Sequence, residues 1–238
     1  MSIARDLTLA ASRVIAVAGA GGKTSLIEAL AREFAQSGEQ VLATTTTKVG
    51  ALEFTSGWHV VDEATEESLL SQKGTIPVFA YDTLTADGDK KTGLSCKLID
   101  SVAREGDFSR ILIEADGSKR RPLKMPAEHE PVIPASTDTL ILVAGLRGLG
   151  EPLSEDIVFR SKLWSEMTRK PLGSIIEPDD FAAMARLYAK KTPLIHRRIL
   201  FLNSAFSNQP KDIIDKIADL MKPEGFDVSA CLLPIPLP

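Results

Sequence analysis

A glycine-rich turn followed by a lysine and a threonine is the segment of the chain best suited to chemistry. It reads Val17-Ala-Gly-Ala-Gly-Gly-Lys-Thr24, and it departs from the strict P-loop pattern at its first position, where Val17 stands in place of a glycine. Glycines allow backbone N–H groups to turn toward a bound anion, and the N-terminus of a following helix adds a partial positive charge. The turn therefore predicts a phosphate-binding loop, whose nucleotide-binding residues are Gly19, Ala20, Gly21, Gly22, Lys23, Thr24 and Ser25.

Two side chains at the end of this turn carry the groups that a nucleoside triphosphate and its metal require. We expect the ammonium group of Lys23 to act as a catalytic group on the β- and γ-phosphates, and the hydroxyl of Thr24 to coordinate Mg²⁺. The alternative is a glycine-rich turn in which both residues are solvated at the start of a helix. An apolar strand pattern before the turn and a helical pattern after it favour the phosphate-binding interpretation.

Two acids follow the apolar run in Arg110-Ile-Leu-Ile-Glu-Ala-Asp116, where a P-loop requires a carboxylate at the end of a neighbouring strand. Glu114 and Asp116 are two positions apart, so in a strand their side chains point to one face. We expect Asp116 to complete the Mg²⁺ site through a water molecule, and Glu114 to orient a water or accept a proton. For Glu114 the simpler alternative is an exposed acid at a strand end.

A threonine run and a lysine, Thr44-Thr-Thr-Thr-Lys48, end another apolar run, at the sheet edge where ligands of open α/β folds bind. Threonine runs are also ordinary strand material. Lys48 is more informative, because a cation at that edge would face the γ-phosphate or an anionic substrate. We therefore count Lys48 among the predicted catalytic residues.

A basic segment, Ser118-Lys-Arg-Arg121, directly follows the acids. It has the alternative of a solvated surface loop, but its position favours transition-state stabilisation or binding of a second, negatively charged substrate. His129 lies in the proline-rich stretch that follows, and without His or Cys partners it suits acid–base chemistry or substrate contact better than metal binding. Arg160 would add another cation, or lie on a helix surface. The predicted substrate-binding residues are Lys119, Arg120, Arg121, His129 and Arg160.

These residues need a scaffold, and the apolar pattern supplies alternating strands and helices. Short β-branched runs predict strands at 13–18, 41–47, 58–62, 76–81, 110–116, 138–144, 199–203 and 228–233. Apolar residues at helical spacing predict helices at 24–34, 65–72, 94–105, 154–167, 179–190 and 211–221. The prolines within residues 122–134 exclude a helix, so we expect that stretch to be an ordered loop or a lid. The alternation predicts an α/β fold, a P-loop NTPase-like three-layer sandwich with a mainly parallel sheet. We expect a single nucleotide-binding domain over residues 1–238, with a small helical insertion at 151–192.

The composition is that of an ordinary globular protein, and it argues against several classes. The 238 residues are 44% hydrophobic and 25% charged, and 28 basic against 32 acidic residues give a formal charge of −4. This balance argues against a dedicated nucleic-acid or membrane-surface binder. Cys96 and Cys231 form neither a disulfide framework nor a zinc motif. No apolar stretch approaches the ~20 residues of a membrane span, and the N-terminus lacks a signal-peptide layout, so we expect a cytoplasmic location.

The residues that follow the predicted strand at 199–203 bear on which base the bound nucleotide carries. Guanine-specific loops carry Asn-Lys-x-Asp after a strand, whereas the corresponding residues here are Asn203-Ser-Ala-Phe206. The Phe206 side chain cannot accept hydrogen bonds from a guanine edge as a carboxylate would. ATP is therefore the expected nucleotide, another nucleoside triphosphate is the alternative, and Mg²⁺ is the expected metal.

On these segments together, the chain resembles the YqeC-type family of accessory proteins for selenium-dependent molybdenum hydroxylases, also described as selenium cofactor biosynthesis proteins. The resemblance extends from about Val14 to Asn203, and its most specific part is 114–134. Phe159 stands where a histidine is expected. The resemblance implies a nucleotide-dependent factor in the maturation of a selenium- and molybdenum-containing hydroxylase, with that enzyme or a cofactor intermediate as its partner.

Three functions fit the same phosphate-binding loop. The leading hypothesis is a Mg²⁺-dependent protein that hydrolyses a nucleoside triphosphate or transfers its phosphate during cofactor maturation. The second is a small-molecule kinase or ATP-dependent ligase that holds an anionic acceptor; the glycine turn is also similar to the Gly-x-x-Gly-Lys-Thr loop of Mur-type ligases. The third is a non-catalytic module in which nucleotide occupancy switches contact with a client enzyme. The sequence leaves the second and third open.

Overall fold

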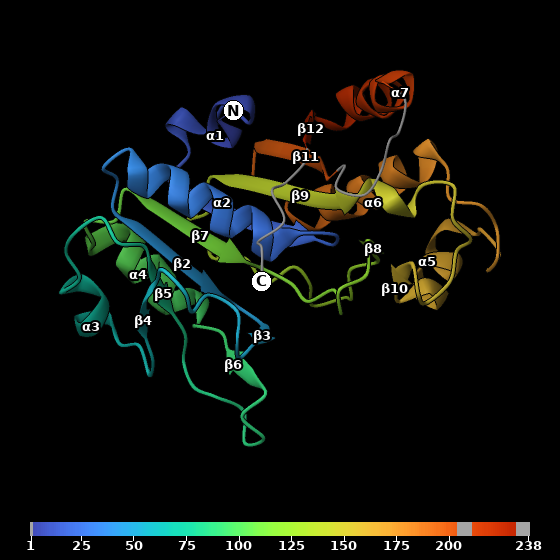
Figure 1. Cartoon of the computed structure of the whole chain (residues 1–238). Helices are drawn as coiled ribbons and strands as arrows, with labels where there is room; N and C mark the ends of the chain where they lie inside the picture. Colours follow the sequence, from blue (N-terminus) through green and yellow to red (C-terminus); the bar gives the residue numbers. More distant parts are fainter. Residues whose placement is uncertain (1, 204–210, 232–238) are drawn as a thin grey trace. The chain divides into compact units, whose positions relative to one another are not determined.

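The computed structural model describes residues 2–203 and 211–231, and the chain divides into two compact units. The first unit comprises Met1–Val17, Leu26–Gly117 and Val132–Thr139, and the second comprises Ala18–Ser25, Ser118–Pro131 and Leu140–Pro238. The fold is α/β, with mainly parallel strands flanked by helices (Figure 1), which confirms the predicted P-loop NTPase-like fold class. That the whole chain is one domain stays a prediction.

Five parallel strands, in the order β1-β7-β2-β5-β4, form the centre of the first unit. They are β1 (Val14–Gly19, whose last two residues belong to the second unit), β2 (Val41–Thr45), β4 (His59–Val61), β5 (Val78–Ala80) and β7 (Arg110–Glu114). Every residue of β1, β2 and β5 is buried, as the apolar runs predict for strands covered on both faces. In the register of the sheet, Glu114 lies opposite Val17 on one side and Thr45 on the other. The carboxyl ends of three strands therefore meet at one edge.

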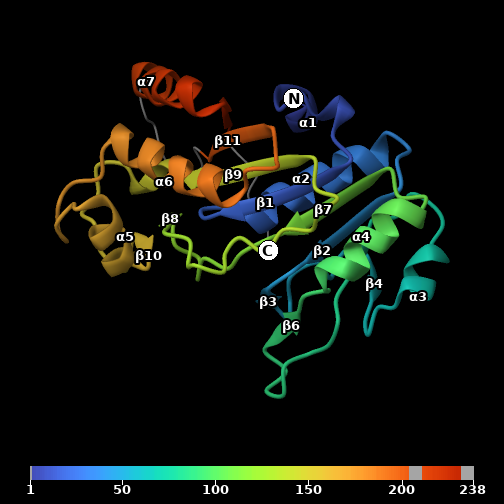
Figure 2. The same ribbon diagram turned by 180° about the vertical axis from the view of Figure 1, so that it is seen from behind.

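Two helices cover opposite faces of these strands. Helix α2 (Lys23–Gln36) lies in front of them in Figure 1, and α4 (Cys96–Glu105) lies in front in the reverse view of Figure 2. The Ser95 hydroxyl caps α4 by accepting the N–H of Leu98 at 3.2 Å. The buried face of α4, including Ile99 and Val102, shares one apolar cluster with Ile111 and other inward residues of β7, β2 and β5. These helices and strands hold the carboxyl edge in place.

The chain turns away after β2 earlier than the apolar pattern predicts. The strand ends at Thr45, where its hydroxyl accepts the N–H of Thr47 at 3.0 Å, a local bond that competes with continued strand pairing. The next residues form β3 (Lys48–Gly50), which pairs antiparallel with β6 (Lys90–Thr92). The sequence did not predict this pair, because three-residue strands carry too little periodicity and the two strands lie about 40 residues apart in the chain. The remaining elements of this unit are α1 (Ile3–Asp6), a 3₁₀ turn (Leu9–Ala11) and α3 (Glu66–Leu70).

The second unit contains strands in the order β12-β11-β9. They are β9 (Thr139–Gly145, whose first residue belongs to the first unit), β11 (Arg197–Asn203) and β12 (Phe226–Cys231). Strands β11 and β12 run parallel, and helices α6 (Pro178–Lys191) and α7 (Lys211–Met221) lie in the same unit, with 3₁₀ turns at Leu146–Gly148 and Lys222–Glu224. The predicted strand at 228–233 begins earlier, at Phe226, and its residues 232 and 233 lie outside the described residues.

The predicted helix at 154–167 is wrong in its first half. Helix α5 spans only Ser161–Thr168, and before it β10 (Val158–Phe159) pairs with β8 (Leu123–Lys124) of the proline-rich stretch. Arg160, between them, has a left-handed φ of 66° that interrupts any helix. The Glu155 carboxylate accepts the backbone N–H groups of Arg160 and Ser161 at 3.1 and 3.0 Å, so it caps α5. The pattern could not show that a strand partner lies more than 30 residues away. The helical insertion at 151–192 stays a prediction.

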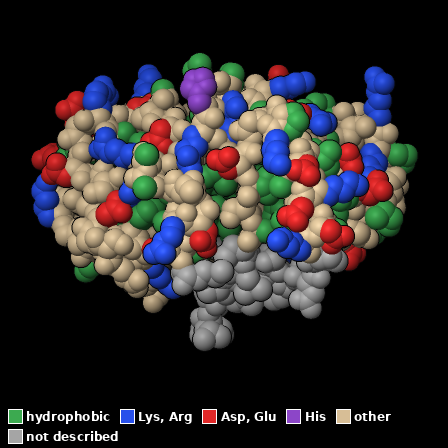
Figure 3. All heavy atoms as spheres, turned by 90° about the horizontal axis from the view of Figure 1, so that it is seen from above, with side chains coloured by type: hydrophobic (Ala, Val, Ile, Leu, Met, Phe, Trp, Pro, Cys, Tyr) green, Lys and Arg blue, Asp and Glu red, His purple; other side chains and the backbone are tan. Residues whose placement is uncertain are grey.

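The distribution of charged side chains on the surface is consistent with the small net charge. On the face shown in Figure 3, basic and acidic side chains are intermixed among the described residues, as a formal charge of −4 suggests. None of the helices in the described ranges is both long and apolar enough to cross a membrane.

Candidate functional site

The chain leaves β1 through a loop that accepts only glycine at two positions. Gly19 and Gly21 have φ angles of 94° and 87°, which residues with a side chain rarely adopt. A Cβ atom on Gly19 would lie 2.2 Å from the carbonyl oxygen of Val143, and one on Gly21 would lie 2.7 Å from that of Pro122. Both obstacles are backbone atoms, which cannot swing aside. The loop is therefore packed against β9 and the residue before β8.

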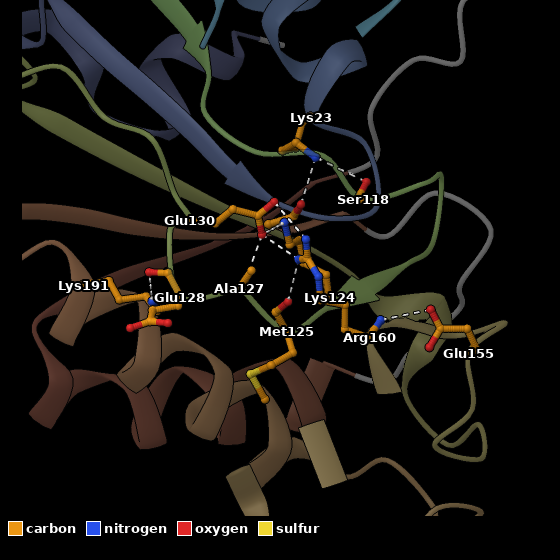
Figure 4. Close-up of polar contacts among 11 residues, drawn as sticks. Lys23, Ser118, Lys124, Met125, Ala127, Glu128, Glu130, Glu155, Arg160 and Lys191 are labelled. Carbon is orange, nitrogen blue, oxygen red and sulfur yellow. Dashed lines mark hydrogen bonds and ion pairs between the residues drawn. The ribbon is translucent and has the colours of Figure 1, made fainter. Parts of the chain in front are cut away.

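Lys23, the first residue of α2, is almost fully buried, with 4% of its surface exposed. Its Nζ donates to the Gly19 carbonyl oxygen at 2.9 Å and to the Ser118 hydroxyl at 3.3 Å (Figure 4). Thr24 and Ser25 are half-buried in the first turn of the helix, where backbone N–H groups have no partner within the helix itself. The ammonium group thus lies back over the loop, among oxygen acceptors and at a helix start.

Two hydrogen bonds from the second unit fix the loop further. The Asn203 side-chain amide, at the end of β11, donates to the Gly21 carbonyl oxygen at 2.6 Å, and the Ala20 N–H donates to the Val143 carbonyl at 2.9 Å. This role of Asn203 is not among the sequence-based predictions, although a polar residue at the carboxyl end of an apolar strand is a usable signal. The Ser204-Ala-Phe206 turn, from which ATP was inferred, lies outside the described residues.

The predicted basic segment begins at Ser118, in contact with the loop lysine. Lys119 and Arg120 follow with left-handed φ angles of 47° and 60°, and both are exposed. Arg121 forms an ion pair with Asp156 at 3.2 Å. The segment therefore presents two exposed cations, whereas Arg121 is neutralised by an acid of its own unit.

A buried carboxylate, that of Glu130, binds two further cations of this unit, Lys124 and Arg160 (Figure 4). Its Oε2 accepts from Lys124 Nζ at 2.8 Å, from Arg160 Nη1 at 2.6 Å and from the Ala127 N–H at 3.1 Å. The side chains of Lys124 and Glu130 are 0% and 8% exposed. Burial alone raises the pKa of Glu130, but the hydrogen bonds from Arg160 and Lys124 outweigh it and lower the pKa from 4.5 to about 2. Glu130 is therefore ionised at any pH near neutrality.

The aromatic ring of Phe159 forms the other side of this cluster. Its centroid lies 4.4 Å from Arg160 Cζ, 5.1 Å from Lys119 Nζ and 5.8 Å from Lys124 Nζ, all within cation–π range. Arg160, which is predicted to contact substrate, donates to the Glu130 carboxylate in this structure. His129 is exposed on the same segment. Substrate binding by Arg160 and His129 stays a prediction.

The predicted acids lie in the first unit, at the carboxyl end of β7. Glu114 and Asp116 are buried, with 6% and 0% exposed, so Glu114 is not the exposed acid of the alternative interpretation. The Glu114 carbonyl oxygen accepts the Thr45 hydroxyl at 2.9 Å and the Thr46 N–H at 3.1 Å. The threonine run and the acid-bearing strand are therefore joined. Lys48 stands apart from them as the exposed first residue of β3, opposite Thr92 of β6.

The residues predicted to bind nucleotide and metal fit a phosphate group better than a bare ion. Within residues 2–203 and 211–231, no three or more His, Cys, Asp or Glu side chains form a group that would hold a metal. Mg²⁺ needs no such group, because it is commonly bound through one or two side chains together with phosphate oxygens and waters. The glycine cradle and the buried Lys23 match a phosphate chain. Thr24 and Asp116 belong to different units, and their shared metal site stays a prediction.

The chain is similar to a known protein family and to a bacterial protein of the same name. A family model described as YqeC protein matches residues 15–162, a range that includes the glycine loop, both acids, the basic segment and the Glu130 cluster. A protein of Escherichia coli (strain K12) with the name "Uncharacterized protein YqeC" is 37% identical over 194 residues, which is 80% of this chain and 75% of that relative. No solved structure matches the chain.

Proposed function

The chain belongs to the YqeC protein family, and on that premise we propose that it is a Mg²⁺-dependent protein that binds and hydrolyses a nucleoside triphosphate, with ATP as the expected nucleotide. The observation that carries the proposal is the loop between β1 and α2. Its backbone leaves no room for a side chain at Gly19 or Gly21, and it ends in the buried ammonium group of Lys23. A turn of this kind at a helix N-terminus suits phosphate oxygens.

Binding would proceed by exchange of partners at Lys23. Its Nζ already donates to a carbonyl and a hydroxyl oxygen, and a β- or γ-phosphate oxygen would take the place of such an acceptor. Hydrogen bonds between a charged donor and a charged acceptor are the stronger kind, so the exchange favours the bound state. The Ala20 N–H already donates to the Val143 carbonyl, so the remaining donors would come from other N–H groups of the loop and of the first turn of α2.

The metal and the attacking water require further groups. Mg²⁺ supplies neutralisation of the phosphate charge. The Thr24 hydroxyl and the Asp116 carboxylate are the proposed groups for holding it, and Glu114 is the proposed group for orienting water or accepting its proton. Lys48 is retained as a proposed cation for the γ-phosphate or an anionic substrate.

We propose that this activity serves the maturation of a selenium-dependent molybdenum hydroxylase or its cofactor in the cytoplasm. The support for this role is the family resemblance of the 114–134 block and the glycine turn. The partner would be the hydroxylase or a cofactor intermediate, with neither nucleic acid nor membrane involved.

A second function, a small-molecule kinase or ATP-dependent ligase acting on an anionic substrate, is favoured by one observation. The Ser118 hydroxyl accepts from Lys23 Nζ, so the basic segment begins at the lysine proposed to bind phosphate. Lys119 and Arg120, both exposed, could then hold an anionic acceptor close to the reacting phosphate.

The test is to measure binding and hydrolysis of ATP, GTP, CTP and UTP, each with and without Mg²⁺, by the wild type, Lys23→Ala and Asp116→Asn. Turnover that both substitutions abolish supports the hydrolytic function. Turnover that appears only with an added phosphorylated or carboxylate acceptor supports the kinase or ligase. Tight binding without turnover supports a nucleotide-switched binding module. A folded wild type that binds none of the four contradicts the proposal.

A further inference from the structure

The segment Ser118–Pro131 touches the glycine loop at two points. The Ser118 hydroxyl accepts from Lys23 Nζ at 3.3 Å. The Pro122 carbonyl oxygen lies where a Cβ on Gly21 would approach it to 2.7 Å, and it also accepts the Gly145 N–H at 2.9 Å. A displacement of this segment would therefore change the contacts of the glycine loop and of Lys23.

The backbone pairing of this segment is too short to hold it alone. Strands β8 and β10 are two residues each, and the flanking bonds are those from the Leu123 N–H to the Ile157 carbonyl at 3.1 Å and from the Met125 N–H to the Phe159 carbonyl at 3.0 Å. Isolated two-stranded pairs are marginally stable at best in water. Side-chain contacts also fix the segment: Leu123 and Met125 are buried, and Lys191 Nζ donates to the Glu128 carbonyl oxygen at 2.7 Å.

Glu130 joins the parts of the segment to one another and to the residue after β10. Its carboxylate ties together Lys124 on β8, the Ala127 N–H within the segment, and Arg160, which follows β10. Arg160 Nη1 also donates to the Met125 carbonyl at 3.2 Å, so the guanidinium joins the carboxylate to the backbone beside β8. Removing one member of a buried ion cluster leaves the others uncompensated, which is far more costly than losing a surface pair.

We propose that Glu130 is a positioning residue for the nucleotide site: by holding Lys124 and Arg160 it fixes the segment that presents Ser118 to Lys23. The inference rests on the proposed function for its binding readout. It differs from a general stabilising role because the segment that Glu130 holds is the one that contacts the loop. In this role Lys124 and Arg160 act through Glu130, and the exposed Lys119 and Arg120 are two further cations for an anionic ligand.

The second unit offers a matched control in Asp180. Its side chain is also 8% exposed and also forms an ion pair, with Lys170 at 2.5 Å. Its other hydrogen bond, from the Glu177 N–H at 2.7 Å, caps α6 and contacts neither the loop nor the basic segment. Asp180→Asn should therefore weaken the fold without disturbing the nucleotide site.

The experiment measures MgATP affinity by calorimetry, together with thermal unfolding and backbone hydrogen exchange, for the wild type, Glu130→Gln, Glu130→Asp and Asp180→Asn. We expect Glu130→Gln to bind MgATP at least tenfold more weakly, Glu130→Asp to recover part of that loss, and Asp180→Asn to bind within twofold of the wild type even when its melting temperature falls as far. Exchange should accelerate in Glu130→Gln at 118–130 and at 19–24. Glu130→Gln that is folded and binds like the wild type overturns the inference.

Failure of the proposed function would be visible separately. If the wild type binds none of the four nucleotides with Mg²⁺, the nucleotide proposal is contradicted, and hydrogen exchange in the free protein decides whether Glu130 controls the loop. Faster exchange at 19–24 in Glu130→Gln but not in Asp180→Asn supports that coupling. Unchanged exchange at 19–24 contradicts it.

Discussion

Lys23 at the end of the glycine loop and Lys91 in the antiparallel β3–β6 pair are both almost fully buried, yet their surroundings differ. Their exposed fractions are 4% and 3%. Lys23 donates to the Gly19 carbonyl and the Ser118 hydroxyl, within a turn whose backbone is packed too closely for side chains. Those partners are polar atoms that a phosphate oxygen would replace.

Lys91 lies between two aromatic rings and a backbone carbonyl oxygen. Its Nζ lies 5.1 Å from the centroid of Phe79 and 5.5 Å from that of Tyr81, and it donates to the Glu53 carbonyl at 2.6 Å. Burial lowers its pKa, an effect that the nearby Glu53 carboxylate partly offsets. This lysine anchors β6 on the rings of Phe79 and Tyr81. The comparison teaches that the burial of a lysine does not by itself indicate a phosphate site; the atoms around the ammonium group do.

The largest expected difference between the two regions lies in their glycines. Gly19→Ala would place a Cβ 2.2 Å from a backbone oxygen at a φ of 94°, so we expect a loss of about 3 kcal/mol or more in the free energy of unfolding. Gly88→Ala, in the turn before β6, has a φ of 73° with no atom within 4 Å, and should cost only about 1 to 2 kcal/mol. Urea unfolding of both variants measures the contrast. Equal losses would mean that the loop is not tightly packed.

Acid should weaken the Glu130 cluster beside the glycine loop. The pKa of Glu130 lies at about 2 in the folded protein, below its ordinary 4.5, so its stabilisation is complete above pH 4.5 and is lost as the pH falls toward 2. The drop in pKa corresponds to about 3 kcal/mol. The wild type should therefore lose stability relative to Glu130→Gln between pH 5 and 2, measured by urea unfolding at each pH. Parallel pH profiles for the two proteins would contradict the ion cluster.

A smaller effect is expected at the end of β11. Asn203→Ala removes the amide that donates to the Gly21 carbonyl at 2.6 Å, which should cost about 1 to 3 kcal/mol of stability. Because the lost bond holds the glycine loop, MgATP affinity should fall as well, by a few-fold. Thermal unfolding and calorimetry test the two effects. Loss of stability with unchanged affinity would show that Asn203 supports the strand and not the loop.

The smallest effect on stability is expected for Lys91. Its pH dependence lies in the alkaline range, whereas that of Glu130 lies in the acid range. Because its folded pKa is lowered below the ordinary 10.5, the unfolded chain binds more protons just below pH 10.5, and stability rises with pH in that range. Lys91→Met should lack this rise. Comparing thermal unfolding of the two proteins from pH 8 to 10.5 checks the sign. A wild type that gains no stability relative to Lys91→Met would contradict a desolvated ammonium group.

The parts of the fold that the sequence predicts are those with a local signal. β1 is an unbroken apolar run, α2 has apolar residues at helical spacing, and the glycines between them admit few conformations. Their arrangement is confirmed. The acid-bearing strand was likewise predictable, because the apolar residues before Glu114 are consecutive in the chain.

The remaining contacts join residues far apart in the sequence. Lys23 and Ser118 are 95 positions apart, and the amide of Asn203 reaches Gly21 over 182 positions. Glu130 has no predicted role, since an acid in a proline-rich stretch gives no indication that two cations surround it. No periodicity in the sequence indicates such pairs. The Glu130 cluster, the β8–β10 pair and the contacts of Ser118 and Asn203 with the glycine loop are therefore seen only in the folded chain.

The central claim, that the glycine loop and its lysine bind a triphosphate, is tested most directly by calorimetric titration of MgATP into the wild type, Lys23→Met and Lys91→Met. Both substitutions remove a buried ammonium group of similar exposure, so they differ only in its surroundings. We predict that Lys23→Met weakens binding about 10- to 100-fold, the cost of a lost charged hydrogen bond, while Lys91→Met stays within about twofold. Equal affinities for the wild type and Lys23→Met, or an equal loss in both variants, would contradict the account.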